Sequence, residues 1–410
     1  MALSLLDAYR ELCAERPAFL LMPGALAGLR VLDLADQAGA LAGRLLAGLG
    51  ADVILVEPPR GSRLRTIPPF WRGAPDRERS LFFWFYALGK RSVTLDWTVP
   101  AGAALLERLV ATADMLIETE RPGTFAALGA AHPRLVVASI TPFGQRGPYR
   151  DWQASDLVAQ AMGGLLYVNG HPDGPPLQSL GLQAYHQAGI FAATGMLAAL
   201  LARETTGRGQ HIDVSLQAAV ASALEHVPGR WHQAGEIPRR QGTLHWSRWF
   251  RVGRCRDGYV LHCTLGDWTS LLEWVRADGM AADLGAPQWE DAVYRHAQAE
   301  HLFAVLDAWA ARYTMAELQE GAQARRLAYA AVCAPEALLA DPQLAARDFF
   351  VPIDHPDLGC EVPYPGMPFR LVEMPRPSRP PLLGEHNAVV YGALGLGPEE
   401  VEDLAGRGVV

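Results

Sequence analysis

The chain is poor in lysine, in cysteine and in long apolar runs. Lys90 is the only lysine among 36 basic residues, and five cysteines are scattered over 410 residues without a Cys-x-x-Cys pair. An odd, scattered set argues against a disulfide framework or a zinc ribbon and predicts reduced thiols in a cytoplasmic protein. No stretch approaches the roughly 20 uninterrupted apolar residues of a transmembrane helix. No signal peptide is recognisable, so we expect no membrane association.

The charge balance also excludes some classes of protein. The chain has 44 acidic and 36 basic residues and a formal net charge of −8, so nothing in its overall charge favours a nucleic-acid partner. His226 and His232 are too far apart and too poorly accompanied to predict a metal site, and we expect no metal. With 50% hydrophobic and 20% charged residues, the composition is that of a globular enzyme.

Strands and helices alternate in the first part of the chain. Residues 29–57 read as strand, small-residue turn, helix and strand, and 100–113, 114–118 and 134–141 continue as helix, strand and strand. This alternation predicts an α/β fold with a mostly parallel, doubly wound sheet. The turn after the first strand lacks Gly-x-Gly-x-x-Gly, which disfavours a nicotinamide site. Asp33 and Glu57 are read as strand-end residues.

Basic residues follow two of the predicted strands. Arg60, Arg63 and Arg65 lie in the loop after the strand at 52–57, and Lys90-Arg91 opens the next strand. Ligands of open α/β sheets bind at the carboxyl ends of the strands, and both arginine and lysine suit phosphate. A solvated basic loop, and the chance survival of one lysine, are the alternatives.

A long apolar stretch follows in the middle of the chain. Residues 188–202 predict a buried helix, a charged turn comes next, and residues 211–214 predict a strand. Upstream, Asp156 is either an acid or base in a cleft or a helix N-cap. After about residue 226 the pattern changes to a smaller α+β section, and the proline-rich residues 374–387 predict an extended segment.

A series of short motifs carries a family resemblance over nearly the whole chain from Leu26. They include LAGLRVLDL with Gln37-Ala-Gly, Gly50-Ala-Asp-Val-Ile, Gly89-Lys-Arg-Ser, Arg121-Pro-Gly, Phe143-Gly-Gln-Arg-Gly-Pro-Tyr, Gly207-Arg-Gly-Gln, Asp341-Pro-Gln-Leu and Leu383-Gly-Glu-His. In this order they resemble the family III CoA-transferases, which comprise formyl-CoA and carnitine CoA-transferases and α-methylacyl-CoA racemases.

The resemblance implies an α/β fold with a Rossmann-like large domain built from both chain ends, a smaller α+β domain and an interlocked dimer. The expected divisions are an N-terminal helical extension at 1–25, the large domain at 26–225 and 331–410, and the small domain at 226–330. It also implies coenzyme A as acyl-CoA substrate, with Gln37, Ala38, Arg63, Lys90 and Arg91 as the expected binding residues. In the transferases an aspartate attacks the thioester and forms anhydride and CoA-thioester intermediates.

The chain departs from that pattern at the aspartate. Tyr185 stands at the corresponding position, and no Asp or Glu lies between Gly174 and Arg203. Three hypotheses follow. The chain is a non-catalytic subunit whose homologous partner carries the aspartate, as in the two-subunit succinyl-CoA:benzylsuccinate CoA-transferase of anaerobic toluene degradation. Alternatively, it is a racemase-like enzyme that uses Asp156, although Ser155 replaces the preceding histidine, or a binding or scaffold protein without catalysis.

Overall fold

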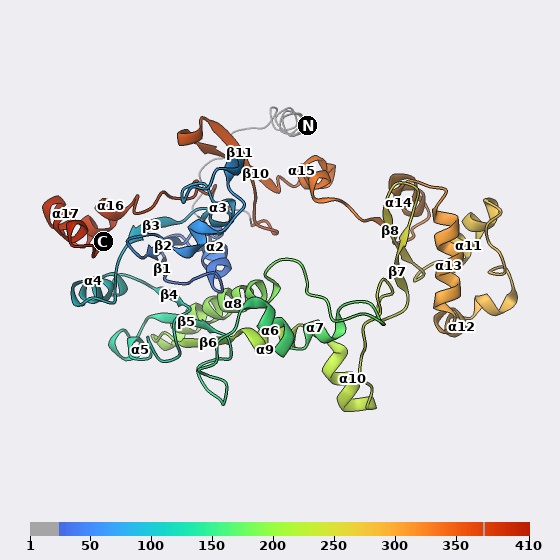
Figure 1. The fold of residues 1–410 in the computed structure, drawn as a ribbon, viewed down its shortest axis with the longest axis horizontal. Coiled ribbons are helices and arrows are strands. Elements are labelled where there is room, and N and C mark those ends of the chain that lie inside the picture. The colour runs from blue at the N-terminus through green and yellow to red at the C-terminus, as the bar shows by residue number, and fades with distance from the viewer. Residues whose placement is uncertain (1–23, 372–373) are drawn as a thin grey trace. The chain divides into compact units, whose positions relative to one another are not determined.

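A computed structural model describes residues 24–371 and 374–410, which form two compact units (Figure 1). The first unit contains the described residues up to 165 together with 179–229 and 342–410, and the second contains 166–178 and 230–341. Residues 166–178, assigned to the large domain from the sequence, therefore pack with the second unit. The helix expected in residues 1–25 lies outside the described residues except for its last two positions.

The first unit is built on a six-stranded parallel sheet in the order β3-β2-β1-β4-β5-β6 (Figure 1). Its strands are β1 (Arg30–Asp33), β2 (Asp52–Glu57), β3 (Arg91–Thr94), β4 (Met115–Glu118), β5 (Val136–Thr141) and β6 (His211–Ser215). This strand order reverses between β1 and β4, which is the Rossmann arrangement, and ligands of such sheets bind at the carboxyl ends of the strands near that reversal. The predicted Rossmann-like fold is confirmed.

Helices cover both faces of this sheet. Val31, Ile117 and Ala138 belong to a core cluster with residues of α2 and α8, while Leu32, Leu116 and Val137 belong to another with residues of α4 and α16. The helices of the unit are α2 (Ala40–Gly48), α3 (Leu81–Ala87), α4 (Pro100–Val110), α5 (Leu128–Ala131), α6 (Asp156–Met162), α8 (Gln183–Thr206), α9 (Leu216–Ser222), α15 (Pro342–Ala346), α16 (Asn387–Ala393) and α17 (Pro398–Gly406).

Helix α8 is longer than the sequence predicts at both ends. It begins at Gln183, so Tyr185 lies in its first turn, and it continues past the buried Arg203 because that guanidinium donates to Asp114 Oδ1 at 3.0 Å. It ends at Gly207, whose φ of 67° is left-handed. Among the described residues α8 alone has the length and apolarity of a membrane span, yet its alanines pack on the sheet as in a core helix.

Two further segments complete the first unit. An antiparallel hairpin, β10 (Phe350–His355) with β11 (Cys360–Pro365), shares a core cluster with the aromatic side chains of α3. Residues 374–381 have no regular structure and run on to α16, which agrees with the extended segment that their prolines predict.

The second unit combines three antiparallel strands with helices, as the α+β pattern predicts. The expected hairpin is β7 (Phe250–Arg254) and β8 (Tyr259–Cys263), and β9 (Ala330–Ala331) pairs with β8. Its helices are α11 (Trp268–Ala277), α12 (Ala292–Ala297), α13 (Ala299–Ala310) and α14 (Met315–Ala324). Two other helices, α7 (Leu165–Val168) and α10 (His226–Ala234), have residues in both units. Its core includes Trp289 and Trp309.

Candidate active site

The turn between β1 and α2 lies at the carboxyl end of the sheet and is organised by Asp36. Its carboxylate accepts the Ala38 N–H at 2.8 Å, its carbonyl accepts the Gly39 N–H at 3.2 Å, and its own N–H donates to Thr119 Oγ1 at 2.8 Å. Gln37 and Ala38 are both half-buried. The predicted Gln37-Ala38 turn therefore exists at the expected edge, and an acid that sequence reasoning missed stands directly before it.

Lys90 is buried beneath the first turn of α2. Its ammonium lies 2.6 Å from Asp33 Oδ2 and donates to the Ala40 carbonyl at 3.2 Å, and only 3% of the residue is exposed. Gly43 leaves the space for this pair, since a Cβ built there would lie 2.1 Å from Asp33 Oδ2. The only lysine in the chain thus forms a buried ion pair, and its charge is neutralised within the fold.

The arginines predicted for coenzyme A are dispersed. Arg91 lies at the amino end of its strand, where its guanidinium is 2.6 Å from Asp52 Oδ1, away from the Gln37-Ala38 turn. Arg63 is exposed, whereas the neighbouring Arg65 is fully buried and bonds both oxygens of Glu57, at 2.7 and 2.8 Å. Glu57 and Arg65 therefore stabilise the loop itself.

Tyr185 lies in the first turn of α8 and is held there by Asp156. The Tyr185 N–H donates to Asp156 Oδ1 at 3.0 Å, and Gln160 Nε2 donates to Asp156 Oδ2 at 2.5 Å. The N-cap expected at Asp156 is instead Ser155, because its backbone is extended and its hydroxyl accepts the Val158 N–H at 3.4 Å. Asp156 is buried, and both of its oxygens are bonded: Oδ1 fixes the start of α8, and Oδ2 accepts from Gln160 of its own helix α6.

The charges of two acids, Asp36 and Asp156, act on Tyr185. Burial raises the pKa of its phenol and the charges of Asp36 and Asp156 raise it further, although a hydrogen bond with the Asp156 backbone opposes this, so the hydroxyl stays protonated at neutral pH. Nearby, burial raises the pKa of Glu120, with a contribution from Asp36. Burial also raises the pKa of Glu118, at the end of β4, to about 7 although hydrogen bonds from Ser139 and the Glu120 N–H oppose this. The strand ends here carry acidic side chains, and Lys90 and Arg91 are both engaged elsewhere.

His186 follows Tyr185 and pairs with α3. Its Nε2 lies 2.7 Å from the Tyr86 hydroxyl. Burial lowers the pKa of His186 and raises that of Tyr86 to about 12, so both groups are neutral at pH 7. Sequence reasoning did not single out this pair. The available signal was the polar run Gln183-Ala-Tyr-His-Gln187 that precedes the small, apolar part of the helix.

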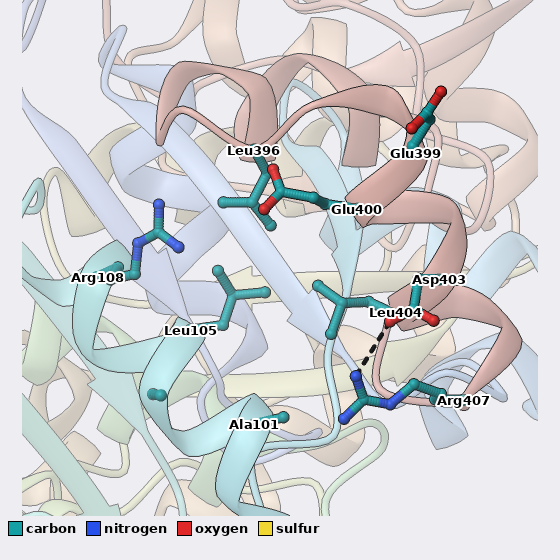
Figure 2. A pocket seen from close by; sticks show the side chains of 10 residues that line it. Ala101, Leu105, Arg108, Leu396, Glu399, Glu400, Asp403, Leu404 and Arg407 are labelled. Carbon is teal, nitrogen blue, oxygen red and sulfur yellow. Dashed lines mark hydrogen bonds and ion pairs between the residues drawn. The ribbon is translucent and has the colours of Figure 1, made fainter.

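Among the described residues, no group of three or more His, Cys, Asp and Glu side chains could hold a metal ion. An open groove of about 490 Å³ lies elsewhere in the first unit, between α4 and α17 (Figure 2). Leu105 and Leu404 point into it, and Arg108, Glu400 and Arg407 surround it. None of the residues predicted for coenzyme A lines this groove.

Comparisons with known proteins agree over nearly the full chain. Residues 26–387 match the model of CoA-transferase family III. Succinyl-CoA:(R)-benzylsuccinate CoA-transferase subunit BbsE of Thauera aromatica is 33% identical, with 93% of this chain and 97% of that protein covered. Formyl-CoA:oxalate CoA-transferase of Streptomyces avermitilis is 35% identical, with 95% and 100% covered. The crystal structure of a CAIB/BAIF family protein from Brucella suis superimposes with a TM-score of 0.81 at 29% identity, covering 91% of this chain and 100% of that one.

Proposed function

Because this chain belongs to CoA-transferase family III, we propose that it is the non-catalytic subunit of a heteromeric CoA-transferase. A homologous partner subunit supplies the nucleophilic aspartate. The proposal rests on the first turn of α8, where Tyr185 stands at the position that the family resemblance predicts for the nucleophile, and where the carboxylate of Asp156, on the neighbouring helix α6, is occupied by two hydrogen bonds.

The proposed reaction moves CoA from an acyl-CoA to a second carboxylic acid. The partner's aspartate attacks the thioester carbonyl and the C–S bond breaks. The CoA thiolate departs, and an acyl-aspartyl anhydride is formed. The thiolate then attacks the aspartyl carbonyl and releases the first acid. The second acid attacks the resulting aspartyl thioester, which releases the CoA thiolate and forms a second anhydride. The thiolate finally attacks the acyl carbonyl of that anhydride, which gives the new acyl-CoA and frees the aspartate. Each step exchanges activated acyl groups of similar energy, so none needs an outside energy source.

Tyr185 is unsuited to the nucleophilic step. A carboxylate is ionised at neutral pH, whereas the phenol of Tyr185 has a pKa raised above its usual value of 10 by burial. An acyl-tyrosine would also be an ester rather than an anhydride, and the free CoA thiol would attack it with a less favourable leaving group. The chain therefore contributes shape and binding rather than the acyl carrier.

An exposed apolar face of α8 supports a partner subunit. Ile190, Phe191 and Leu201 are 50%, 46% and 74% exposed on this helix, and Leu157 of α6 is 45% exposed. The opposite side of α8 packs on the sheet of its own unit. Exposed apolar side chains on the helix whose first turn holds Tyr185 fit a contact with a homologous subunit. An interlocked dimer is the arrangement that we propose.

The substrates are proposed from the relatives. Succinyl-CoA is the donor and benzylsuccinate a candidate acceptor, which would place the enzyme in toluene degradation in the reducing cytoplasm. On this chain Gln37, Ala38 and Arg63 are the proposed contacts to coenzyme A, because they remain accessible at the strand ends. Lys90 and Arg91 would act on coenzyme A only after giving up their ion pairs. The engaged carboxylate of Asp156 gives no support to the racemase alternative.

The test is to purify the chain alone and together with a family III chain encoded beside its gene. Succinyl-CoA and benzylsuccinate are supplied, and the formation of benzylsuccinyl-CoA is followed by mass spectrometry. We expect the pair to copurify and to transfer CoA, and the lone chain to be inactive. Transfer by the lone chain at the rate of the pair would overturn the proposal. Epimerisation of a 2-methylacyl-CoA that is lost in Asp156→Asn would support the racemase alternative instead.

A further inference from the structure

In the β1–α2 turn of this chain, an acidic residue of the turn itself accepts the backbone N–H groups. Asp36 accepts two successive turn amides, from Ala38 through its carboxylate at 2.8 Å and from Gly39 through its carbonyl at 3.2 Å. A phosphate or carboxylate that approached this edge of the sheet would normally be bound by such amides. Here the Ala38 N–H is already bound to a negative oxygen, so an anionic ligand would have to displace that oxygen and remain beside it.

The same turn lies close to the site of Tyr185. Helix α8 packs on the first turn of α2, because a Cβ built at Gly189 would lie 3.0 Å from Leu41 Cβ. Ala38 and Tyr185 pack against the same core cluster. The charge of Asp36 acts on the Tyr185 phenol and on Glu120. The acids that act on Tyr185 thus come from two elements, Asp36 before α2 and Asp156 at the start of α6, and Asp36 also acts on Glu120 after β4.

We propose that Asp36 is a specificity-determining residue that opposes carboxylate groups at this chain's own site, so that replacing Tyr185 by aspartate does not by itself create a working transferase site. The inference rests on the proposed function, in which this site does not carry the nucleophile. It deepens that function by assigning a second cause of inactivity, in addition to the missing nucleophile. The groups excluded are a carboxylate nucleophile at position 185 and the carboxylate of an acid substrate.

Asp36 would act through two separable effects. Its hydrogen bond occupies the Ala38 amide, and its charge opposes a second negative group nearby. A carboxylate introduced at position 185 would be exposed to the charges of Asp36 and Asp156, and like charges favour the protonated, non-nucleophilic form. Asn at position 36 keeps an oxygen for the Ala38 N–H but removes the charge, whereas Ala removes both.

The experiment uses the purified full-length chain with succinyl-CoA as the probe. Hydroxylamine is added to trap an acylated carboxylate as a hydroxamate, and mass spectrometry locates the trapped residue. The variants are Tyr185→Asp alone and Tyr185→Asp combined with Asp36→Asn or with Asp36→Ala. The matched control combines Tyr185→Asp with Asp291→Asn, because Asp291 makes the same bond to the N–H two residues on, at 2.8 Å, in the second unit. Circular dichroism and binding of free CoA show that each variant is folded.

We expect labelling at position 185 to be higher with Asp36→Asn than in Tyr185→Asp alone. At an assay pH below the pKa of the introduced carboxylate, the increase should be about tenfold for each pKa unit that the charge of Asp36 adds. Asp36→Ala should also raise the labelling, and the Asp291 control should behave as Tyr185→Asp alone. Equal labelling in all variants, or none in any, would overturn the inference. Transfer of CoA by the unmodified lone chain would instead overturn the proposed function, which makes the two failures distinguishable.

Discussion

Replacing Lys90 by methionine should destabilise the first unit strongly, because it leaves Asp33 buried without a counter-ion. Asp33 and Lys90 are 0% and 3% exposed, and their charged atoms are 2.6 Å apart. Removing one partner of a buried ion pair costs roughly 3–5 kcal/mol. We expect a loss in this range in urea denaturation, with coenzyme A binding unchanged where the variant is still folded.

Two further variants show whether the ion pair is the cause. Asp33→Asn added to Lys90→Met should recover at least half of the lost stability, because the buried charge is gone while Asn can still accept the Ala35 N–H, now bonded at 3.1 Å. Arg407→Met is the matched control, because Arg407 forms an exposed ion pair with Asp403 at 3.0 Å. It should cost less than about 1 kcal/mol.

The opposite result would restore the role that the sequence predicts for Lys90. If Lys90→Met lost less than about 1 kcal/mol but weakened CoA binding tenfold or more, Lys90 would be a ligand of coenzyme A rather than part of the fold. The argument from the buried ion pair would then be wrong.

Three other predictions follow from the same region. Gly43→Ala should unfold or strongly destabilise the first unit, since its Cβ would lie 2.1 Å from Asp33 Oδ2. Gly392→Ala, in α16, should instead stabilise the unit by roughly 0.5–1 kcal/mol, because a Cβ there has no neighbour within 4 Å. Thermal melts of both variants test this pair of predictions. Asp156→Ala should cost roughly 1–3 kcal/mol because the Tyr185 N–H loses its acceptor, and Asp156→Asn should cost less; equal losses in urea denaturation would refute this. Burial raises the folded-state pKa of Glu118 from 4.5 to about 7, so the folded state binds a proton that the unfolded state has lost, and stability falls as the pH rises through that window. In Glu118→Gln this loss of stability, on the order of 3 kcal/mol, should be absent. The same dependence of stability on pH in the variant and the unmodified chain would contradict the prediction.

The sheet could be predicted because its pattern is local. A strand, a small-residue turn, a helix and a strand within residues 29–57 fold as β1, α2 and β2 at nearly the predicted positions. The motifs in order also predicted the family, which is confirmed. The end of α8 was less predictable, because Arg203 reads as part of a charged turn and is kept in the helix by Asp114, a residue distant in sequence.

The site was harder to predict because its character depends on partners. A lysine at a strand opening suggests a phosphate ligand, but only the fold shows that Asp33 has neutralised it. Likewise, Asp156 reads as a lone carboxylate until Tyr185 and Gln160 are seen to occupy its oxygens. Sequence gives the type of a charged group, whereas its availability is decided by long-range contacts.

The most direct measurement for the central claim is to locate the covalent intermediate. The chain and its copurified family III partner are incubated with succinyl-CoA and hydroxylamine, and peptides of both chains are mapped by mass spectrometry. We predict a hydroxamate on an aspartate of the partner and none on any residue of this chain. A hydroxamate on this chain, above all at Asp156, would contradict its assignment as the non-catalytic subunit.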